Sequence, residues 1–259
     1  MRSYRKEEKS MYKNPGIELE ENLVRALSHR YEELSNNMKT LVKHLFGYVE
    51  PDSEVQATII EGFMKPDIEI KIDDESHYVS IKSGKSDIVG QEYIKDFCKY
   101  LESYGISQTT IETILLYQYG DGTTDGTGEK RFDYDELRYR LSTRIKEANE
   151  ELNSNKDFVL SVIRRATFKG NKEDNIEADA IYHGNEDYGD VASIAQVMKH
   201  CNRRDWHYIK NLHIGPLHLR PHARYVDKEI KNPMNRERLE FVWVGLGADI
   251  RFISTRYDG

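Results

Sequence analysis

Two short segments carry residues whose types and spacing could do chemistry. Pro66 and Asp67 open the first segment, and Lys82 stands near the end of the second. A carboxylate such as that of Asp67 can bind Mg²⁺, which proteins hold through one or two carboxylates together with carbonyls and waters. A lysine nearby can stabilise developing negative charge or help to position a nucleophile. An aspartate and a lysine also often form a surface ion pair that contributes little to stability or function. The elements that position the two residues therefore decide between these interpretations.

Residues 65–83 predict a β-hairpin that would bring the pair together. Apolar and polar residues alternate on both sides of the polar stretch 73–76, which is typical of two antiparallel strands. With the turn centred between residues 74 and 75, Asp67 faces Lys82 and Glu69 faces Ser80. One face of the hairpin is then apolar, and the other carries these four polar residues. A shift of the register by one residue would exchange the faces.

The pattern Pro66-Asp67, twelve residues, Ser80-Ile81-Lys82 resembles that of the PD-(D/E)XK nuclease family. The predicted order of elements over residues 15–120 is similar to that family's αβββαβ core. Two further positions also match: Gly16-x-x-Leu19-Glu20 resembles the motif of the family's first helix, and Gln91 stands at the start of the helix expected after Lys82.

This resemblance implies a metal-dependent deoxyribonuclease, similar to a type II restriction endonuclease or another prokaryotic defence nuclease. Asp67 and the main-chain carbonyl of Ile81 would bind Mg²⁺, or Mn²⁺ in its place, and Lys82 would contact the phosphate. Ser80 and Gln91 would complete the catalytic residues. The implied partner is double-stranded DNA, cut by a homodimer to leave a 5′-phosphate and a 3′-hydroxyl. No nucleotide cofactor is expected, because Gly84-Lys85-Ser86 lacks the first glycine of a phosphate-binding loop. No membrane contact is expected either, because the chain has no apolar run of the length that a membrane helix needs.

Ser80 departs from the family pattern, because an acidic residue usually stands there. Serine binds Mg²⁺ weakly, so a second carboxylate must come from elsewhere. Glu92 and Glu69 are candidates by position, although Glu92 falls on the polar side of a predicted helix. We favour Glu20, which shares a helical stripe with apolar residues and should therefore have a partner or a metal. Two alternatives stay open: a nuclease-fold protein that binds DNA without cutting it, and an interaction protein with an unused Asp67–Lys82 pair.

The surrounding elements follow from periodicity. Helical spacing predicts helices, and β-branched or alternating runs predict strands, with residues 158–168 of ambiguous type. The expected helices are 17–35, 38–46, 88–103, 134–153 and 191–200; the expected strands are 56–64, 111–119, 176–182, 217–226 and a hairpin within 239–253 that turns at Gly245–Gly247.

Four basic side chains alternate along one side of the segment 218–225 and could meet a phosphate backbone. They are His218, Arg220, His222 and Arg224. An exposed edge strand protected by charge and proline is the alternative. Residues 121–128 imitate the start of a calcium-binding loop, but Phe132 stands where that loop needs a glutamate.

The composition limits the class of protein. The chain has 259 residues and a net charge of −7, but residues 201–259 hold 11 Lys and Arg against 7 Asp and Glu. No apolar run is long enough for a membrane helix, and Cys98 and Cys201 form no disulfide framework, so we expect a cytoplasmic protein. We predict an α/β or α+β fold, with a restriction-endonuclease-like core and a central mixed sheet in residues 1–130. Residues 131–259 would add a helical and β-hairpin extension that contacts DNA or a second subunit and packs separately or as one domain with the core.

Overall fold

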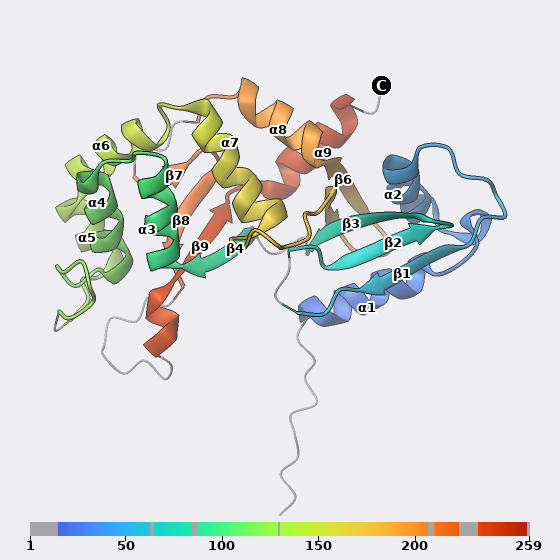
Figure 1. Ribbon diagram of the computed structural model, residues 1–259, viewed down its shortest axis with the longest axis horizontal. Helices are drawn as coiled ribbons and strands as arrows, with labels where there is room; N and C mark the ends of the chain where they lie inside the picture. The colour runs from blue at the N-terminus through green and yellow to red at the C-terminus, as the bar shows by residue number, and fades with distance from the viewer. Residues whose placement is uncertain are drawn as a thin grey trace, which may run out of the picture.

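Two β-sheets organise the molecule, as Figure 1 shows. The computed structural model describes residues 15–62, 65–83, 87–128, 130–206, 210–222 and 233–257. The first sheet has five strands in the order β1-β2-β3-β5-β6, and the second has four in the order β4-β9-β8-β7. Within these described ranges the strands are β1 (Val55–Ile59), β2 (Ile68–Ile72), β3 (Glu75–Lys82), β4 (Ile88–Tyr93), β5 (Ala180–Gly184), β6 (Gly189–Ser193), β7 (His213–Ile214), β8 (Leu217–Pro221) and β9 (Arg238–Trp243).

The first sheet is mixed. Strands β1, β2 and β3 pair antiparallel, β3 and β5 pair parallel, and β5 and β6 pair antiparallel. The predicted α/β class with a central mixed sheet is therefore confirmed. Each sheet joins strands from both sides of residue 130.

The predicted hairpin forms β2 and β3, but its register differs from the prediction by two residues. Ile72 pairs with Glu75, so the turn consists of Asp73 and Asp74. Asp73 has a φ of 52°, a left-handed conformation that aspartate tolerates better than most residues. As a result Glu69 lies opposite Tyr78 instead of Ser80. Because side chains alternate with a period of two, a shift of two residues leaves every side chain on its predicted face.

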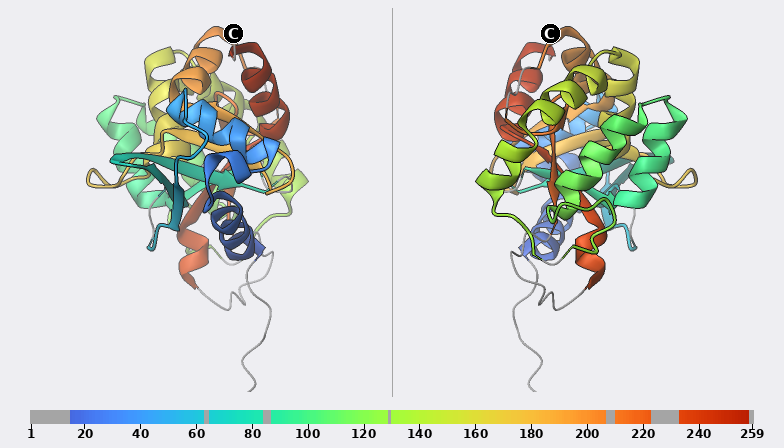
Figure 2. Two further views of the ribbon diagram at one scale, coloured as in Figure 1. Left: turned by 90° about the vertical axis from the view of Figure 1, so that its right-hand side faces the viewer. Right: turned by 90° about the vertical axis from the view of Figure 1, so that its left-hand side faces the viewer.

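Helices cover both faces of the first sheet. On one face α1 and α2 pack over the isoleucines of β2, and on the other α8 and α9 contact β6. The two views in Figure 2 show α1 and α2 at one end of the molecule, and α4, α5 and α6 at the other. The helices are α1 (Pro15–Leu27), α2 (Asn36–Phe46), α3 (Ile94–Ser103), α4 (Gln108–Tyr119), α5 (Tyr134–Arg140), α6 (Ser142–Leu152), α7 (Lys156–Arg164), α8 (Ile194–Arg203) and α9 (Leu246–Tyr257), with short turns η1 (Tyr31–Glu33), η2 (Arg165–Lys169) and η3 (Pro233–Glu237).

The strand predicted at residues 111–119 is wrong, because these residues belong to α4. Ile111, Ile114 and Tyr117 are buried and recur every three residues, which suits one face of a helix. Ser107 caps the helix start, and Gly120 ends it in a left-handed conformation. The strand that completes the expected core is instead β5, which comes from much later in the chain.

Two other predictions change type. Residues 88–93 form β4, and the helix expected over 88–103 begins only at Ile94. The hairpin expected about Gly245 is also wrong, because β9 is followed by α9. Leu246, Ile250 and Ile253 are fully buried at helical spacing, so this segment packs one face of a helix against the core.

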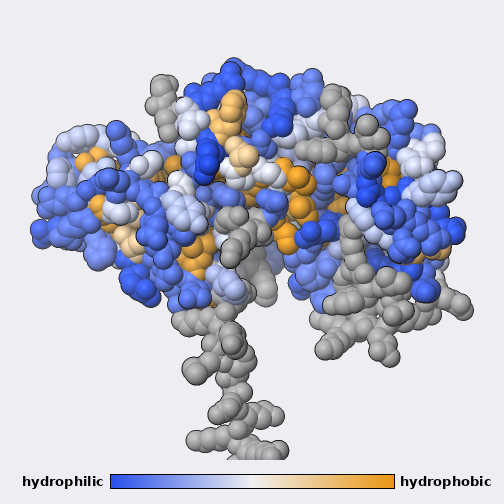
Figure 3. All heavy atoms as spheres, turned by 180° about the vertical axis from the view of Figure 1, so that it is seen from behind, coloured by the Kyte–Doolittle hydropathy of each residue, from blue (hydrophilic) through white to orange (hydrophobic). Residues whose placement is uncertain are grey.

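Seen from behind, most of the coloured surface is hydrophilic, with smaller hydrophobic patches between (Figure 3). Within the described residues, no helix is both long and apolar enough to cross a membrane.

Candidate active site

Asp67 and the end of β3 form a compact polar cluster where β2 begins. Asp67 Oδ2 accepts hydrogen bonds from the main-chain nitrogen of Ile81 at 2.5 Å and from Ser80 Oγ at 3.2 Å. The Asp67 main-chain nitrogen donates to the carbonyl of Val79. The carboxylate is therefore held against β3 by both its main chain and its side chain.

Lys82 turns back toward this carboxylate. Its Nζ lies 3.6 Å from Asp67 Oδ2 and donates to the Ile81 carbonyl at 3.0 Å. The side chains of Lys82 and Asp67 are 16% and 23% exposed, so both are largely shielded but open to solvent. The structure thus brings together the predicted acid, carbonyl and cation, although the register places Asp67 beside Ser80 and not opposite Lys82.

Glu20, from α1, belongs to the same electrostatic environment. Burial raises the pKa of its carboxyl group above the ordinary value; the charge of Asp67 raises this pKa further, and that of Lys82 lowers it. The charge of Asp67 therefore disfavours the ionised form of Glu20, and a divalent cation bound between the two carboxyl groups would relieve this repulsion.

The donor set fits a small hard cation. Asp67 and Glu20 would supply carboxylates, and Ile81 would supply a carbonyl oxygen that Lys82 now contacts. Oxygen ligands with no more than two carboxylates are typical of Mg²⁺, and Mn²⁺ accepts the same donors. In the described part of the chain, no group of three or more His, Cys, Asp or Glu side chains is placed to hold a metal ion. The candidate site therefore depends on a main-chain ligand and on substrate or water for the rest.

Ser80 and Glu69 do not lie opposite each other, as the predicted register had them. Ser80 is fully buried, and its hydroxyl donates to Asp67. Glu69, on β2, lies opposite Tyr78 of β3, which is two residues before Ser80.

Glu92 has a different partner from the one predicted. The helical prediction put Glu92 on the exposed side and Gln91 on the buried side, whereas on β4 Glu92 is buried and Gln91 is exposed. Glu92 Oε2 accepts a hydrogen bond from Arg165 at 2.7 Å. Burial raises the pKa of Glu92, and the hydrogen bond from Arg165 opposes that shift. Glu92 therefore forms a structural ion pair with Arg165.

Gln91 lies beside His222, one of the residues predicted to contact DNA. Its Nε2 is 3.2 Å from Glu240 Oε1, and Glu240 also accepts hydrogen bonds from Arg220 at 2.6 Å and His222 at 2.7 Å. Glu240 is only 4% exposed. The buried Glu240 on β9 therefore forms hydrogen bonds with one side chain from β4 and two from the segment that contains and follows β8.

The predicted basic row is partly neutralised. Residues on β8 alternate between buried and half-buried, as expected. On the side away from β9, β7 pairs with β8 only at Leu217 and His218, so the edge-strand alternative is wrong for these two residues. Arg220 and His222 share Glu240. His218 Nδ1 is 3.2 Å from Asn211 Nδ2, and burial lowers the pKa of His218. Arg224 and the segment Gly84–Ser86 lie outside the described residues.

No sequence pattern pointed to Lys65, the residue before Pro66. Its amine donates to the carbonyl of Val89 at 2.8 Å and to that of Ala166. Burial, reinforced by the charge of Lys82, lowers the pKa of Lys65 to about 7, and the charges of Asp67 and Glu92 oppose the shift. Its partners come from distant parts of the chain, so no local pattern could have revealed them.

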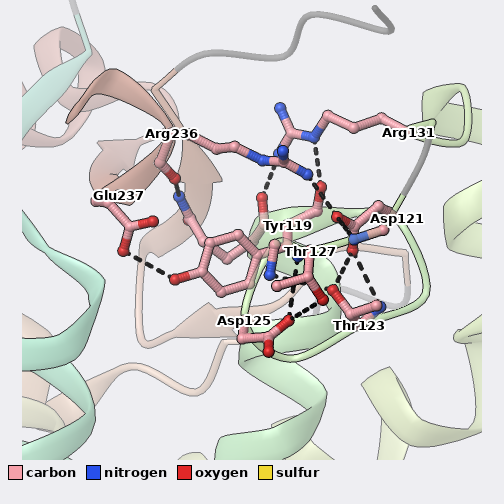
Figure 4. Close-up of polar contacts among 11 residues, drawn as sticks. Tyr119, Asp121, Thr123, Asp125, Thr127, Arg131, Arg236 and Glu237 are labelled. Carbon is pink, nitrogen blue, oxygen red and sulfur yellow. Dashed lines mark hydrogen bonds and ion pairs between the residues drawn. The ribbon is translucent and has the colours of Figure 1, made fainter. Parts of the chain in front are cut away.

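The loop at residues 121–128 is not a calcium site. Asp121 Oδ1 accepts hydrogen bonds from the Thr123 main chain and hydroxyl, and Asp121 Oδ2 accepts from Gly128 and Arg236 (Figure 4). The Asp121 side chain is fully buried. Both oxygens of Asp121 already accept hydrogen bonds from the protein, and its ion pair with Arg236 links the loop after α4 to η3.

No protein-family model and no curated protein matches the sequence. Among solved structures, the chain is similar to the crystal structure of the restriction endonuclease MspI in complex with its cognate DNA. The identity is 13% and the TM-score is 0.48, over 85% of this chain and 86% of that one.

Proposed function

We propose that this chain is a Mg²⁺- or Mn²⁺-dependent endonuclease that hydrolyses phosphodiester bonds in double-stranded DNA, with a PD-(D/E)XK-type active site. The observation that carries the proposal is the meeting of Asp67, the Ile81 main chain and Lys82 at the end of β3, with Glu20 nearby. This is the combination of oxygen ligands and one cation that metal-assisted phosphodiester hydrolysis needs.

Each residue has a separate task. Asp67, Glu20 and the Ile81 carbonyl would hold the metal ion, which would polarise the phosphate and acidify an attacking water. Lys82 now divides its amine between the Ile81 carbonyl and Asp67. On binding of substrate it would turn toward the phosphate and stabilise the negative charge that develops there. Ser80 would keep Asp67 oriented through its buried hydroxyl.

The second sheet offers polar side chains for DNA. The side chains of Arg220 and His222 are 39% and 31% exposed, and Gln91 is exposed beside them. Each can still contact DNA while Glu240 holds it in place. Because Glu240 offsets one positive charge, we expect oriented contacts and not simple charge neutralisation.

A catalytically inactive DNA-binding or interaction protein is the second candidate, and Ser80 favours it. This residue is fully buried where the family has an acid, so it cannot become a metal ligand without a change in β3. Metal binding separates the two candidates, because only the endonuclease needs it.

Incubation of supercoiled plasmid and phage DNA with the protein tests the proposal. We expect cleavage in Mg²⁺ or Mn²⁺, none in EDTA, and none with Asp67→Asn or Lys82→Ala. Glu69→Gln is the matched control, because Glu69 lies on the same strand face two residues from Asp67. Binding of DNA with no cleavage in either metal would support the inactive protein, and unchanged cleavage by Asp67→Asn and Lys82→Ala would place the active site elsewhere.

A further inference from the structure

The side chain of Lys65 runs through a passage that two glycines keep open. A Cβ atom on Gly90 would lie 2.5 Å from Lys65 Nζ and would also collide with the Ala166 carbonyl. A Cβ atom on Gly170 would lie 3.3 Å from Lys65 Cγ and closer still to Asn175. Gly170 also has a φ of 82°, which disfavours other residues. The surrounding chain is therefore shaped to admit this lysine.

The amine of Lys65 ends on two main-chain carbonyls from different elements. Val89 belongs to β4 in the second sheet, and Ala166 belongs to η2. The same two elements are joined by the Glu92–Arg165 ion pair, whose side chains are 3% and 16% exposed. Lys65 thus adds the segment before β2 to a junction that already links β4 and η2.

This junction lies close to Asp67 along the chain. Only Pro66, which is buried and has a fixed φ, separates Lys65 from Asp67. Two residues of extended chain span roughly 7 Å. Asp67 is therefore held from one side by β3, through its bonds to Val79 and Ile81, and from the other by Lys65.

We propose that Lys65 is a positioning residue that fixes Asp67 relative to β4, so that the sheet bearing Gln91 and the sheet bearing Lys82 act as one unit. The expected effect of Lys65 on DNA cleavage rests on the function proposed above, whereas the positioning of Asp67 by Lys65 is a property of the folded protein alone. Gln91 is two residues beyond Val89 on β4, so a contact made by Gln91 would be transmitted over roughly 7 Å of strand to the lysine. A lysine with only a structural role would stabilise the fold without changing how Asp67 meets β3.

Hydrogen exchange of the Ile81 amide measures this positioning without DNA or metal, because that amide donates to Asp67 Oδ2. Lys65→Met keeps the aliphatic stem in the passage and removes the donor. Gly90→Ala keeps the lysine and obstructs its end point. Lys71→Met, on β2 itself, is the matched control. We expect the first two variants to speed exchange of the Ile81 amide about tenfold, relative to the Ile70 and Ile72 amides, and the control to leave it unchanged.

Single-turnover cleavage of DNA by the same variants separates positioning from the proposed function. We expect Lys65→Met to lower the cleavage rate about tenfold or more with DNA affinity within about threefold of the wild type. Unchanged relative exchange of Ile81 in both variants would overturn the positioning role, whatever the cleavage result. Faster exchange in a protein whose wild type does not cleave DNA would retain the positioning role and reject the nuclease.

Discussion

Replacement of Asp67 should separate the chemistry of this residue from its part in the fold. The structure gives its carboxylate two buried donors, the Ile81 amide and the Ser80 hydroxyl. Asp67→Ala leaves both without an acceptor, and each unsatisfied buried group costs about 1–3 kcal/mol. We therefore expect the free energy of unfolding to fall by about 2–6 kcal/mol. At about 2–4 °C per kcal/mol for a chain of this size, the Tm should fall by roughly 4–24 °C.

Asp67→Asn should behave differently, because an amide oxygen can still accept from either donor. The loss of stability should then be about 1 kcal/mol, the difference between a charged and a neutral acceptor. Cleavage should nevertheless fall at least about 100-fold in both variants, because an asparagine amide is a poor Mg²⁺ ligand and alanine has no side-chain oxygen to bind the ion. Thermal unfolding in EDTA and plasmid cleavage in Mg²⁺ measure the two effects. Equal stability of the two variants would refute the account of the buried donors, and cleavage by Asp67→Asn at the wild-type rate would refute the role in catalysis.

Three further changes test other parts of the account. Glu20→Gln should raise the Mg²⁺ concentration for half-maximal cleavage about tenfold; it should also stabilise the metal-free protein at neutral pH, because the raised pKa of Glu20 means that folding disfavours its charge. A Glu20→Gln protein with unaltered Mg²⁺ dependence would remove Glu20 from the site. Lys65 has a folded-state pKa of about 7, below its ordinary 10.5. Between pH 7 and pH 10 the unfolded chain therefore holds a proton on this amine that the folded protein lacks. The free energy of unfolding should then rise by roughly 3 kcal/mol over that range. Chemical unfolding of Lys65→Met in EDTA should lack that rise, and an identical pH dependence in both proteins would contradict the assignment. Arg220→Ala should weaken DNA binding about threefold to tenfold and lower the salt slope by about 1, with Arg140→Ala as an exposed control on α5; equal affinity and slope in the two variants would exclude Arg220 from the DNA contact.

The central hairpin was predictable because its chemistry is local. Alternation of isoleucines with polar residues fixed which side chains share a face, and the period of two preserved that result although the register shifted by two residues. The shift arises because the turn uses Asp73 in a left-handed conformation, which alternation alone does not reveal. Asp67 and Lys82 still meet because a lysine side chain is long enough to reach back.

Elements that are buried on several sides were harder to predict. Ile111–Tyr119 is rich in apolar and β-branched residues, as in a buried strand, but its burial follows the spacing of a helix. For Gln91 and Glu92 the error of type also inverted the exposed and buried sides. The position of Lys65 depends on Gly90, Ala166 and Gly170, and only the tertiary fold brings these residues together.

The most direct test of the central claim is the titration of Mn²⁺ into wild-type protein and Asp67→Asn, with plasmid cleavage followed in the same samples. We predict that the wild type binds Mn²⁺ and cuts DNA over the same range of metal concentration, and that Asp67→Asn loses both. Cleavage that persists in the variant, or that proceeds in EDTA, would contradict a metal site built on Asp67.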